Sequence, residues 1–404
     1  MNRLVLIGNG FDLAHGLKTS YADFIDWYKE YRLKQLFQVH NNKSDELLLT
    51  VNLKERQAFS LYIQGLVWDN PKVSLIEIFD YIVNEDKKVD AISTPFYDRL
   101  IKSIETKGWV DIENEYYQLL KEYTIGKPSD EHLLQLNEQL QYLQELLVKY
   151  LREITEQEID LNEGIRRAIY APINSEDVAV DGKKRWTEYV TSEMNKDERK
   201  LEYKASNYGI GSTYPYEIQD FKNHPWDIKT KDYPHLARLP EQIMLLNFNY
   251  TNTPERYLNR DVATIVPIHG KLDDPETVIF GYGDEIDPSF KELRDLNNGE
   301  CLKNVKSMRY LEAPNYRNVL SFIESAPFQV LIMGHSCGNS DRTLLNTIFE
   351  HRNCISIKPY FYQKEDGSNN YTELIQNISR NFNDMKLMRD RVVNKTQCEP
   401  LVKN

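Results

Sequence analysis

The chain has 404 residues, of which 41% are hydrophobic, and its formal net charge at pH 7 is −12. A chain of this length and composition can bury a large core and form two or three domains, so a soluble globular protein is expected. Because the negative charge is spread along the sequence without a basic cluster, a nucleic-acid groove or an anionic membrane surface is disfavoured as the main partner.

The cysteines and the apolar runs indicate the compartment. Neither a Cys-x-x-Cys pair nor a zinc-type His spacing accompanies the four cysteines, which are predicted to be reduced packing thiols. No apolar run approaches the ~20 residues that span a bilayer. The N-terminus also enters a strand directly, without a signal peptide. We therefore expect a cytoplasmic protein with no membrane contact and no metal site.

The first expected elements are a buried strand and a glycine turn. Leu4–Ile7 are four apolar residues, and Gly8–Asp12 (Gly-Asn-Gly-Phe-Asp) follow at once. Glycines allow close approach of the backbone to a ligand, although the third glycine of the dinucleotide fingerprint is out of register. The capping-box spacing of Ser20 and Asp23 predicts that a helix begins there, which leaves residues 12–19 as a loop.

After that helix, which is expected to end near Phe37, the chain remains helical and polar to about residue 240, with no convincing parallel strand. The stretch Trp109–Tyr117 is also predicted to be helical. Glu113 lies inside its apolar stripe, which indicates a carboxylate that faces the core or a pocket. In the alternative interpretation, Asp111 caps the helix and Glu113 only lies near its positive end.

A long helix is predicted to begin at Ser129, because apolar residues then alternate three and four positions apart, as in a coiled coil. This seam consists of Leu133, Leu136, Leu140, Leu143, Leu147, Tyr150 and Ile154. It requires a partner helix, and a hairpin within the chain is favoured over a second copy of the chain. From Trp186 to Pro240, aperiodic Tyr, Pro, Gly and Trp predict irregular cover or a lid over a pocket.

Strand character returns after Pro240. The apolar runs are Ile243–Asn249, Ile265–Gly270, Val278–Gly283, Val330–Gly334 and Ile355–Tyr362. Helical stretches between several of them imply crossovers and a mostly parallel sheet, to which the first strand most economically belongs. The predicted fold is thus a Rossmann-like α/β domain of residues 1–40 and 241–404. Residues 41–240 form a large helical insertion, with a coiled-coil-like hairpin and an irregular lid.

Four of these strand ends carry small or polar residues. In an open parallel sheet, ligands bind outside the carboxyl ends of the strands, so together they predict a nucleotide-like ligand. The candidates are Gly8, Asn9, Gly10, Phe11, Asp12 and His15 at the first end; Asn247 and Asn249; His269; and Gly334, His335, Ser336 and Asp341.

His269 is the sharpest single candidate. Its strand is otherwise apolar, and an imidazole with a pKa near 6.5 can act as a general base. A lone strand-end histidine is more often structural, but the neighbouring strand ends favour the functional interpretation. Asn249 can orient a water or a carboxamide, while Asn247 shares its face and can instead tie loops. Asp12 and His15 either line the glycine turn or are solvated.

The sequence contains two rival candidate sites. Gly334–Gly338 matches the Gly-x-Ser-x-Gly elbow of α/β-hydrolases, but the only later histidine, His351, follows Ser336 by 15 residues, too few for a triad on that fold. A turn that holds a ribose or phosphate is preferred. A nuclease has little support, because Glu113 has only Asp111 and Glu115 as neighbouring carboxylates.

These motifs resemble the AbiH family of bacterial phage abortive-infection proteins. The resemblance covers both ends of the chain, and it implies a role in antiphage defence by halting the infected cell. The matching segments are Leu4–Phe24, Trp109–Glu113, Asn247–Thr251, Ile268–Gly270, Gly334–Ser336 and Asp341.

The same segments bear a fainter likeness to sirtuin-like NAD-binding domains. The matches are Gly8 and Gly10 with the glycine turn, Asn249 with the NAD-orienting asparagine, His269 with the catalytic histidine, and Gly334 and Ser336 with the late ribose contact. Asn9–Phe11 replaces the usual Ala-Gly-x-Ser pattern, Thr251 stands where an aspartate is common, and no zinc-binding cysteines are present. Protein deacetylation is therefore disfavoured, whereas NAD hydrolysis is compatible.

The expected function is antiphage defence through binding of NAD, or a related nucleotide, and cleavage of its nicotinamide–ribose bond. His269 would accept a proton from a ribose hydroxyl, Asn249 would align water or the carboxamide, and Asp12 or Glu113 would add negative charge. NAD is then a substrate or ligand, with no prosthetic group. The alternative is a nucleotide-sensing module without turnover, whose helical insertion engages a phage-derived trigger, a host protein or a second copy of the chain.

Overall fold

The computed structural model describes residues 1–38, 43–44, 46–54, 72–84, 89–126, 128–156, 159–209 and 233–402. Its centre is a five-stranded sheet in the order β6-β5-β1-β7-β8, with every neighbouring pair parallel. The strands are β1 (Asn2–Ile7), β5 (Ile243–Asn247), β6 (Ala263–Pro267), β7 (Phe328–Met333) and β8 (Cys354–Tyr360). The predicted Rossmann-like parallel sheet, built from both ends of the chain, is therefore confirmed.

The first strand occupies the middle of this sheet. β1 pairs with β5 on one side and β7 on the other, so Leu4 lies between Met244 and Val330. The four apolar residues of Leu4–Ile7 are fully buried. Strands covered on both faces need such continuous apolar runs, because successive side chains point into opposite cores.

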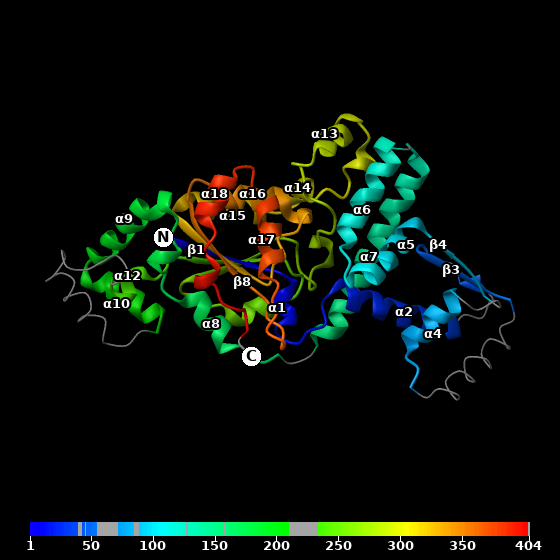
Figure 1. The fold of residues 1–404 in the computed structure, drawn as a ribbon, viewed down its shortest axis with the longest axis horizontal. Helices are drawn as coiled ribbons and strands as arrows, with labels where there is room; N and C mark the ends of the chain where they lie inside the picture. Colours follow the sequence, from blue (N-terminus) through cyan, green and yellow to red (C-terminus); the bar gives the residue numbers. More distant parts are fainter. Residues whose placement is uncertain are drawn as a thin grey trace.

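Helices cover both faces of the sheet (Figure 1). Leu4 and Leu6 pack toward α15 (Asn315–Ser325), α16 (Arg342–Phe349), α17 (Tyr371–Arg380) and α18 (Met385–Arg391). Val5 and Ile7 pack on the other face, toward α8 (Glu163–Tyr170) and Phe11. This layered arrangement leaves the carboxyl ends of the strands for loops.

The glycine turn leads directly into a helix. Residues Asn9–Leu13 form the short helix α1, so the expected loop over residues 12–19 is wrong at its start. Phe11 belongs to this helix and is fully buried against the sheet. Helix α2 (Tyr21–Gln38) has the predicted capping box: the Asp23 N–H donates to Ser20 Oγ at 3.1 Å, and the Ser20 N–H donates to Asp23 Oδ2 at 3.3 Å.

The segment after α2 contains a small sheet that the sequence pattern did not reveal. Its order is β2-β3-β4, all antiparallel. The elements are β2 (Lys43–Ser44), β3 (Leu49–Leu53), α4 (Leu75–Asn84), β4 (Val89–Ser93), α5 (Pro95–Lys107), α6 (Ile112–Lys121) and α7 (Asp130–Thr155). The expectation of an entirely helical stretch is thus wrong there, because strands this short give little periodic signal.

The leucine seam of α7 is buried within this chain. Leu133 to Tyr150 of the seam belong to one core, with Ile154 partly buried against it, and α7 contacts α2 and α6. The partner helices are therefore intramolecular, as the favoured alternative expected. The seam is not available to a second copy of the chain without opening this core.

Two further expectations are corrected. Residues 186–194 and 198–207 are helical rather than irregular, and Trp186, Val190 and Met194 form a buried stripe on the first of these helices. The helices are α9 (Lys183–Met194), α10 (Glu198–Asn207) and α12 (His235–Arg238); Tyr214, Pro215, Tyr216, Pro225 and Trp226 of the expected lid lie outside the described residues. Val278–Gly283 does not join the five-stranded sheet; its backbone instead bonds to loops, as in Ile279 N–H to His269 O at 2.9 Å.

The two halves of the predicted insertion lie apart. Figure 1 shows α6 and α7 at one end of the molecule and α9, α10 and α12 at the other, with the sheet between them. The short helices α13 (Pro288–Asp295) and α14 (Lys306–Arg309) lie on the side of α6. Among the helices described, none has a stretch long and apolar enough to cross a membrane.

Candidate functional site

The side chains of residues 247–251, at the end of β5, contact two groups of candidate residues. We call the group at the glycine turn the first neighbourhood and the group around His269 the second neighbourhood. Asn249 Nδ2 donates to the carbonyl of Gly8 at 3.0 Å, and Thr251 Oγ1 donates to Asp12 Oδ2 at 2.7 Å. Asn247 supports this arrangement, because its Oδ1 accepts the Asn249 N–H at 3.1 Å. The polar residues at odd positions therefore connect β5 to the glycine turn. Asn247 and Asn249 both tie loops, and Asn249 also joins the two ends of the chain.

The residues at even positions, Phe248 and Tyr250, face the second neighbourhood. The ring of Phe248 lies 5.4 Å from that of His269 and 4.1 Å from that of His335, both edge-on. Tyr250 follows, with its ring 6.4 Å from the His269 ring. One short segment thus contacts both candidate neighbourhoods.

Asp12 is the unusual residue of the first neighbourhood. It is 1% exposed, and its Oδ1 is buried without a hydrogen-bond partner. Burial raises the pKa of its carboxyl to about 6, against the opposing effect of the Thr251 hydrogen bond. A buried carboxylate oxygen without a donor is costly, and such groups require an explanation such as a ligand or a catalytic role.

The glycines of the N-terminal turn allow two loops to touch. A Cβ on Gly8 would lie 2.5 Å from His335 Cα, and one on Gly334 would lie 2.0 Å from the Phe11 nitrogen. The Gly10 N–H also donates to the Gly334 carbonyl at 2.8 Å. The conformational freedom of glycine is therefore used for close packing between the loops that follow β1 and β7.

Two residues of this turn lie away from the other candidates. His15 is held between the Phe11 carbonyl, 2.7 Å from Nδ1, and the Tyr257 hydroxyl, 2.6 Å from Nε2. Asn9 is exposed, and its Oδ1 accepts the Thr19 hydroxyl.

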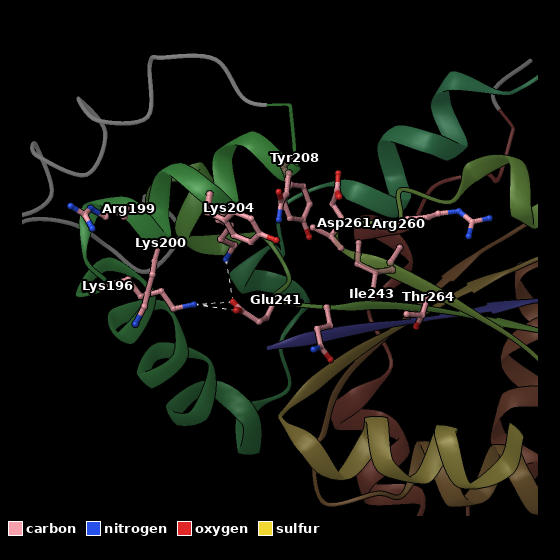
Figure 2. A pocket seen from close by; sticks show the side chains of 15 residues that line it. Lys196, Arg199, Lys200, Lys204, Tyr208, Glu241, Ile243, Arg260, Asp261 and Thr264 are labelled. Carbon is pink, nitrogen blue, oxygen red and sulfur yellow. Dashed lines mark hydrogen bonds and ion pairs between the residues drawn. The ribbon is translucent and has the colours of Figure 1, made fainter. Parts of the chain in front are cut away.

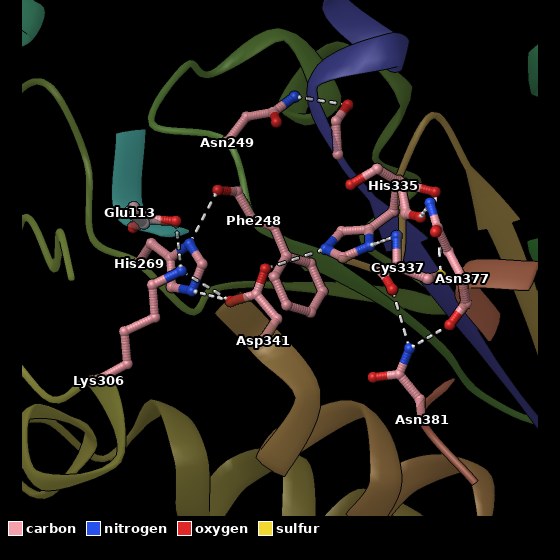
Figure 3. A network of polar contacts seen from close by, with 12 residues as sticks. Glu113, Phe248, Asn249, His269, Lys306, His335, Cys337, Asp341, Asn377 and Asn381 are labelled. Carbon is pink, nitrogen blue, oxygen red and sulfur yellow. Dashed lines mark hydrogen bonds and ion pairs between the residues drawn. The ribbon is translucent and has the colours of Figure 1, made fainter. Parts of the chain in front are cut away.

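The second neighbourhood is a buried cluster of charged side chains (Figure 3). Lys306 Nζ lies 2.9 Å from Glu113 Oε2 and 2.9 Å from Asp341 Oδ1. His269 Nε2 lies 3.1 Å from Asp341 Oδ1, and His335 Nε2 lies 3.5 Å from Asp341 Oδ2. The structure thus brings together four candidates predicted from sequence, around a lysine that was not predicted.

The members come from four separate segments of the chain. His269 follows β6, His335 and Asp341 follow β7, and Lys306 opens α14. Glu113 comes from the first turn of α6, whose N-cap Asp111 accepts the Asn114 N–H at 3.0 Å. Both interpretations of this stretch are therefore correct: the aspartate caps the helix, and the glutamate is buried.

The sequence did not predict Lys306, because no motif or periodic pattern surrounds it. It lies outside every predicted strand end, and it is only 1% exposed in the fold. Lysines are almost never fully buried unless paired, so its position depends on the two carboxylates. This pairing spans 193 positions to Glu113, a separation that no local pattern reports.

The lysine sets the ionisation of the cluster. Burial lowers the pKa of its ammonium, but Asp341 and Glu113 outweigh burial and raise it overall. Burial raises the pKa of Asp341, but Lys306 and His269 outweigh it and hold that pKa well below the usual range. Burial raises the pKa of Glu113 to about 7, because one ammonium does not fully compensate two buried carboxylates.

The surroundings of His269 define its protonation. The Phe248 carbonyl, 3.1 Å from Nδ1, can only accept, so it places a proton on that nitrogen. Nε2 faces the Tyr310 hydroxyl at 3.3 Å as well as Asp341. Burial, with the nearby Lys306 charge, lowers the pKa of the imidazole, which favours the neutral ring. Nε2 faces the Asp341 carboxylate, which can only accept, so Asp341 opposes this shift and stabilises the ring that carries a proton on both nitrogens.

The loop after β7 does not form a serine nucleophile site. Ser336 is exposed, and its carbonyl accepts Asn377 Nδ2 at 3.0 Å. His335 Nδ1 accepts the Cys337 N–H at 2.9 Å, which leaves the proton on Nε2 toward Asp341. The only later histidine, His351, instead pairs with Glu324 at 3.1 Å. The rejection of the hydrolase elbow agrees with this geometry.

A cavity of about 460 Å³ opens at the carboxyl ends of β5 and β6. Its lining includes Asn247, Tyr250, Thr251, Lys271 and Arg152. Thr251, which lines the cavity, donates to Asp12, and Tyr250, which also lines it, has its ring 6.4 Å from the His269 ring. Residues that line this cavity thus contact both neighbourhoods.

The acidic residues of α6 are committed to other contacts. Glu113 binds Lys306, and Glu115 lies 3.7 Å from Lys107. Over the part of the chain that the structure describes, no group of three or more His, Cys, Asp or Glu side chains is arranged to hold a metal ion. This geometry gives no support to a metal-dependent nuclease.

Comparison with known proteins adds one finding. A family model described as bacteriophage abortive infection AbiH matches residues 4–363. No curated protein and no solved structure matches the chain. The match spans all five strands of the parallel sheet and both neighbourhoods of the candidate site.

Proposed function

Because the chain belongs to the AbiH family of bacteriophage abortive-infection proteins, we propose that it halts infected cells by cleaving NAD, or a related nucleotide, at the carboxyl edge of its parallel sheet. The observation that carries the proposal is the cavity of about 460 Å³ whose lining residues Thr251 and Tyr250 contact Asp12 and His269. Its volume lies in the range of roughly 300–1,000 Å³ that small-molecule sites occupy. Its position outside strand ends is where α/β sheets bind nucleotides.

The reaction makes specific demands on the cavity walls. The bond between the ribose carbon and the nicotinamide nitrogen breaks, and its electron pair leaves with nicotinamide. The ribose becomes oxocarbenium-like, and a water oxygen attacks it while a base takes the water proton. Negative charge near the ribose stabilises this transition state, as it does in glycoside hydrolysis.

Two carboxyl groups suit this role for different reasons. Asp12 has an Oδ1 without a hydrogen-bond partner, and its Oδ2 accepts the hydroxyl of Thr251, which lines the cavity. Its pKa of about 6 leaves it largely ionised near pH 7 and able to take a proton. Glu113 is farther inside, bound to Lys306 and to the Gly281 N–H at 3.0 Å, so it acts through the cluster. We assign Asp12 the contact with substrate.

His269 and Asn249 complete the assignment. When Tyr250 and Tyr310 move aside, a ribose hydroxyl can donate to His269 Nε2, and Asp341 then stabilises the imidazolium. Asn249 holds Gly8, so it fixes the turn and can present its amide oxygen to water or a carboxamide. The likeness to sirtuin-like domains stays a prediction, and this mechanism agrees with it.

The test is incubation of the purified chain with NAD, with nicotinamide and ADP-ribose measured by chromatography. Wild-type protein, with infected-cell extract where a trigger is needed, is expected to release both products. Asp12→Asn and His269→Ala should each lower the rate at least about a hundredfold, the usual contribution of acid–base groups. His351→Ala, at the Glu324 pair away from the cavity, is the matched control. Equal rates in all variants would contradict the assignment.

A second candidate function is nucleotide sensing without turnover. It is favoured by one observation: both ring nitrogens of His269 already have protein partners, and His269 is not among the residues that line the cavity. Calorimetry that detects NAD binding without product, even with infected-cell extract, would select this function. The protein would then act through a partner.

A further inference from the structure

A second cavity, of about 500 Å³, lies at the opposite, amino end of β5 and β6 (Figure 2). One wall is α10 with the residues just before it, and the other is the turn between the two strands. We call this cavity the amino-end groove. Its basic lining residues are Lys196, Arg199, Lys200, Lys204 and Arg260.

Two of these five cations are neutralised by the protein itself. Lys196 Nζ lies 3.0 Å from Glu241 Oε2, and Lys204 Nζ lies 2.6 Å from Glu193 Oε2. Figure 2 shows both ammonium groups directed toward Glu241. These pairs form the base of the groove, where the charges of the two lysines and the two glutamates cancel.

The remaining cations are exposed and available to a ligand. Within the described residues, neither Arg199 nor Arg260 takes part in an ion pair. Lys200 has only an exposed contact with Asp197, at 3.6 Å, and such pairs contribute little. Arg199, Lys200 and Arg260 bring three positive charges to the lining and Asp261 one negative charge, so these residues have a net positive charge although the whole protein carries −12.

An aromatic side chain lies beside these cations. Tyr203 is 69% exposed and follows Arg199 and Lys200 by four and three positions, which places it on the same face of α10. A tyrosine has an apolar ring with a polar tip, so an exposed tyrosine can contact a ligand with the face of its ring. A ring that flanks two cations can stack on a planar ligand while the cations hold its charge.

We propose that the amino-end groove binds a nucleotide through its phosphates at Arg199 and Lys200 and its base on Tyr203. Arginine and lysine are the common protein groups for phosphate, and aromatic stacking tolerates any base. The volume suits one nucleotide rather than a polymer. This site lies at the other end of the strands from the proposed catalytic cavity, so it goes beyond the proposed function.

The test is calorimetric titration of the full chain with ADP. The Arg199→Ala/Lys200→Ala variant is expected to bind ADP at least about tenfold more weakly, because charge-assisted hydrogen bonds are lost. Tyr203→Leu should weaken binding about fivefold, whereas Tyr203→Phe retains the ring and the affinity. Lys184→Ala, an exposed lysine of α9 outside the groove, is the matched control. The wild-type affinity should also fall as salt rises.

Other outcomes would overturn the proposal. Unchanged ADP affinity in the Arg199→Ala/Lys200→Ala variant would exclude the groove as the binding site. Figure 2 shows Arg260 and Arg199 at opposite ends of the groove. An oligonucleotide that binds more tightly than ADP and loses affinity in Arg260→Ala would identify a polymer as the ligand instead. NAD turnover in the same variants reports separately on the proposed function, since no groove residue lines the carboxyl-edge cavity.

Discussion

At the scale of single residues, Asp12 and Lys306 show opposite solutions to buried charge. Lys306 has carboxylate oxygens at 2.9 Å on two sides. Asp12 has the Thr251 hydroxyl on one oxygen and no partner on the other. The first arrangement stabilises the charged form, while the second destabilises it. A buried carboxylate that destabilises the fold is expected where selection has acted on function rather than on stability.

The pH dependence of stability tests the state of Asp12. Its folded pKa, about 6, lies above the ordinary value of 3.8, so its favourable contribution to stability is present below pH 3.8 and is lost as pH rises through 6. Asp12→Asn removes this loss and should make the fold more stable than wild type at pH 8, by up to roughly 3 kcal/mol. The advantage should disappear near pH 4. Urea denaturation at both pH values measures it, and a difference independent of pH would contradict it.

At the scale of elements, the loops after β1 and β7 form one packed unit. Gly334 has φ +76° and lies against the Phe11 nitrogen, so both its conformation and its missing Cβ are required. Across the same contact, the Gly10 N–H bonds to the Gly334 carbonyl. The carboxyl ends of these two central strands are thereby fixed relative to each other, as a preorganised site requires.

A matched pair of glycine substitutions separates conformation from contact. Gly16 has φ +78° but nothing within 4 Å of a built Cβ. Gly16→Ala should therefore cost only the left-handed conformation, about 1–2 kcal/mol of unfolding free energy. Gly334→Ala should cost clearly more, because its Cβ meets backbone 2.0 Å away. Thermal or urea unfolding of both variants gives the comparison, and equal losses would show that the loops do not need this contact.

At the scale of the whole molecule, the charged cluster joins the helical segment to the sheet. Glu113 belongs to α6, whereas Asp341 and His269 belong to loops at the strand ends. Lys306 bonds to both sides. A change in the position of α6 would therefore alter the charges around His269, which gives the helical segment a physical route to the candidate site.

Lys306 is the residue through which this coupling can be measured. Lys306→Met leaves two buried carboxyl groups without their cation and should lower the free energy of unfolding by about 3–5 kcal/mol. Adding Glu113→Gln removes one of those charges, so the double variant should recover part of the loss. A double-mutant cycle in urea quantifies the coupling. Additive losses would mean that the two side chains do not interact in solution.

The sequence by itself determined the elements that local pattern specifies. The apolar run Leu4–Ile7 predicted the central strand, the Ser20 and Asp23 spacing predicted the start of α2, and the seam of α7 predicted a buried helix face. Each depends on residues a few positions apart, where side-chain period and capping geometry act directly. Polar strand ends also identified His269, His335 and Asp341, because parallel strands bring their carboxyl ends to one edge.

Only the tertiary structure decided how those residues are used. Lys306 meets Glu113 across 193 positions, and Asn249 meets Gly8 across 241. The same packing turns the expected ligand glycines toward another loop, gathers the basic groove that the sequence does not show as a cluster, and leaves one oxygen of Asp12 without a donor. Contacts between distant segments depend on the geometry of the whole fold, which local periodicity does not encode.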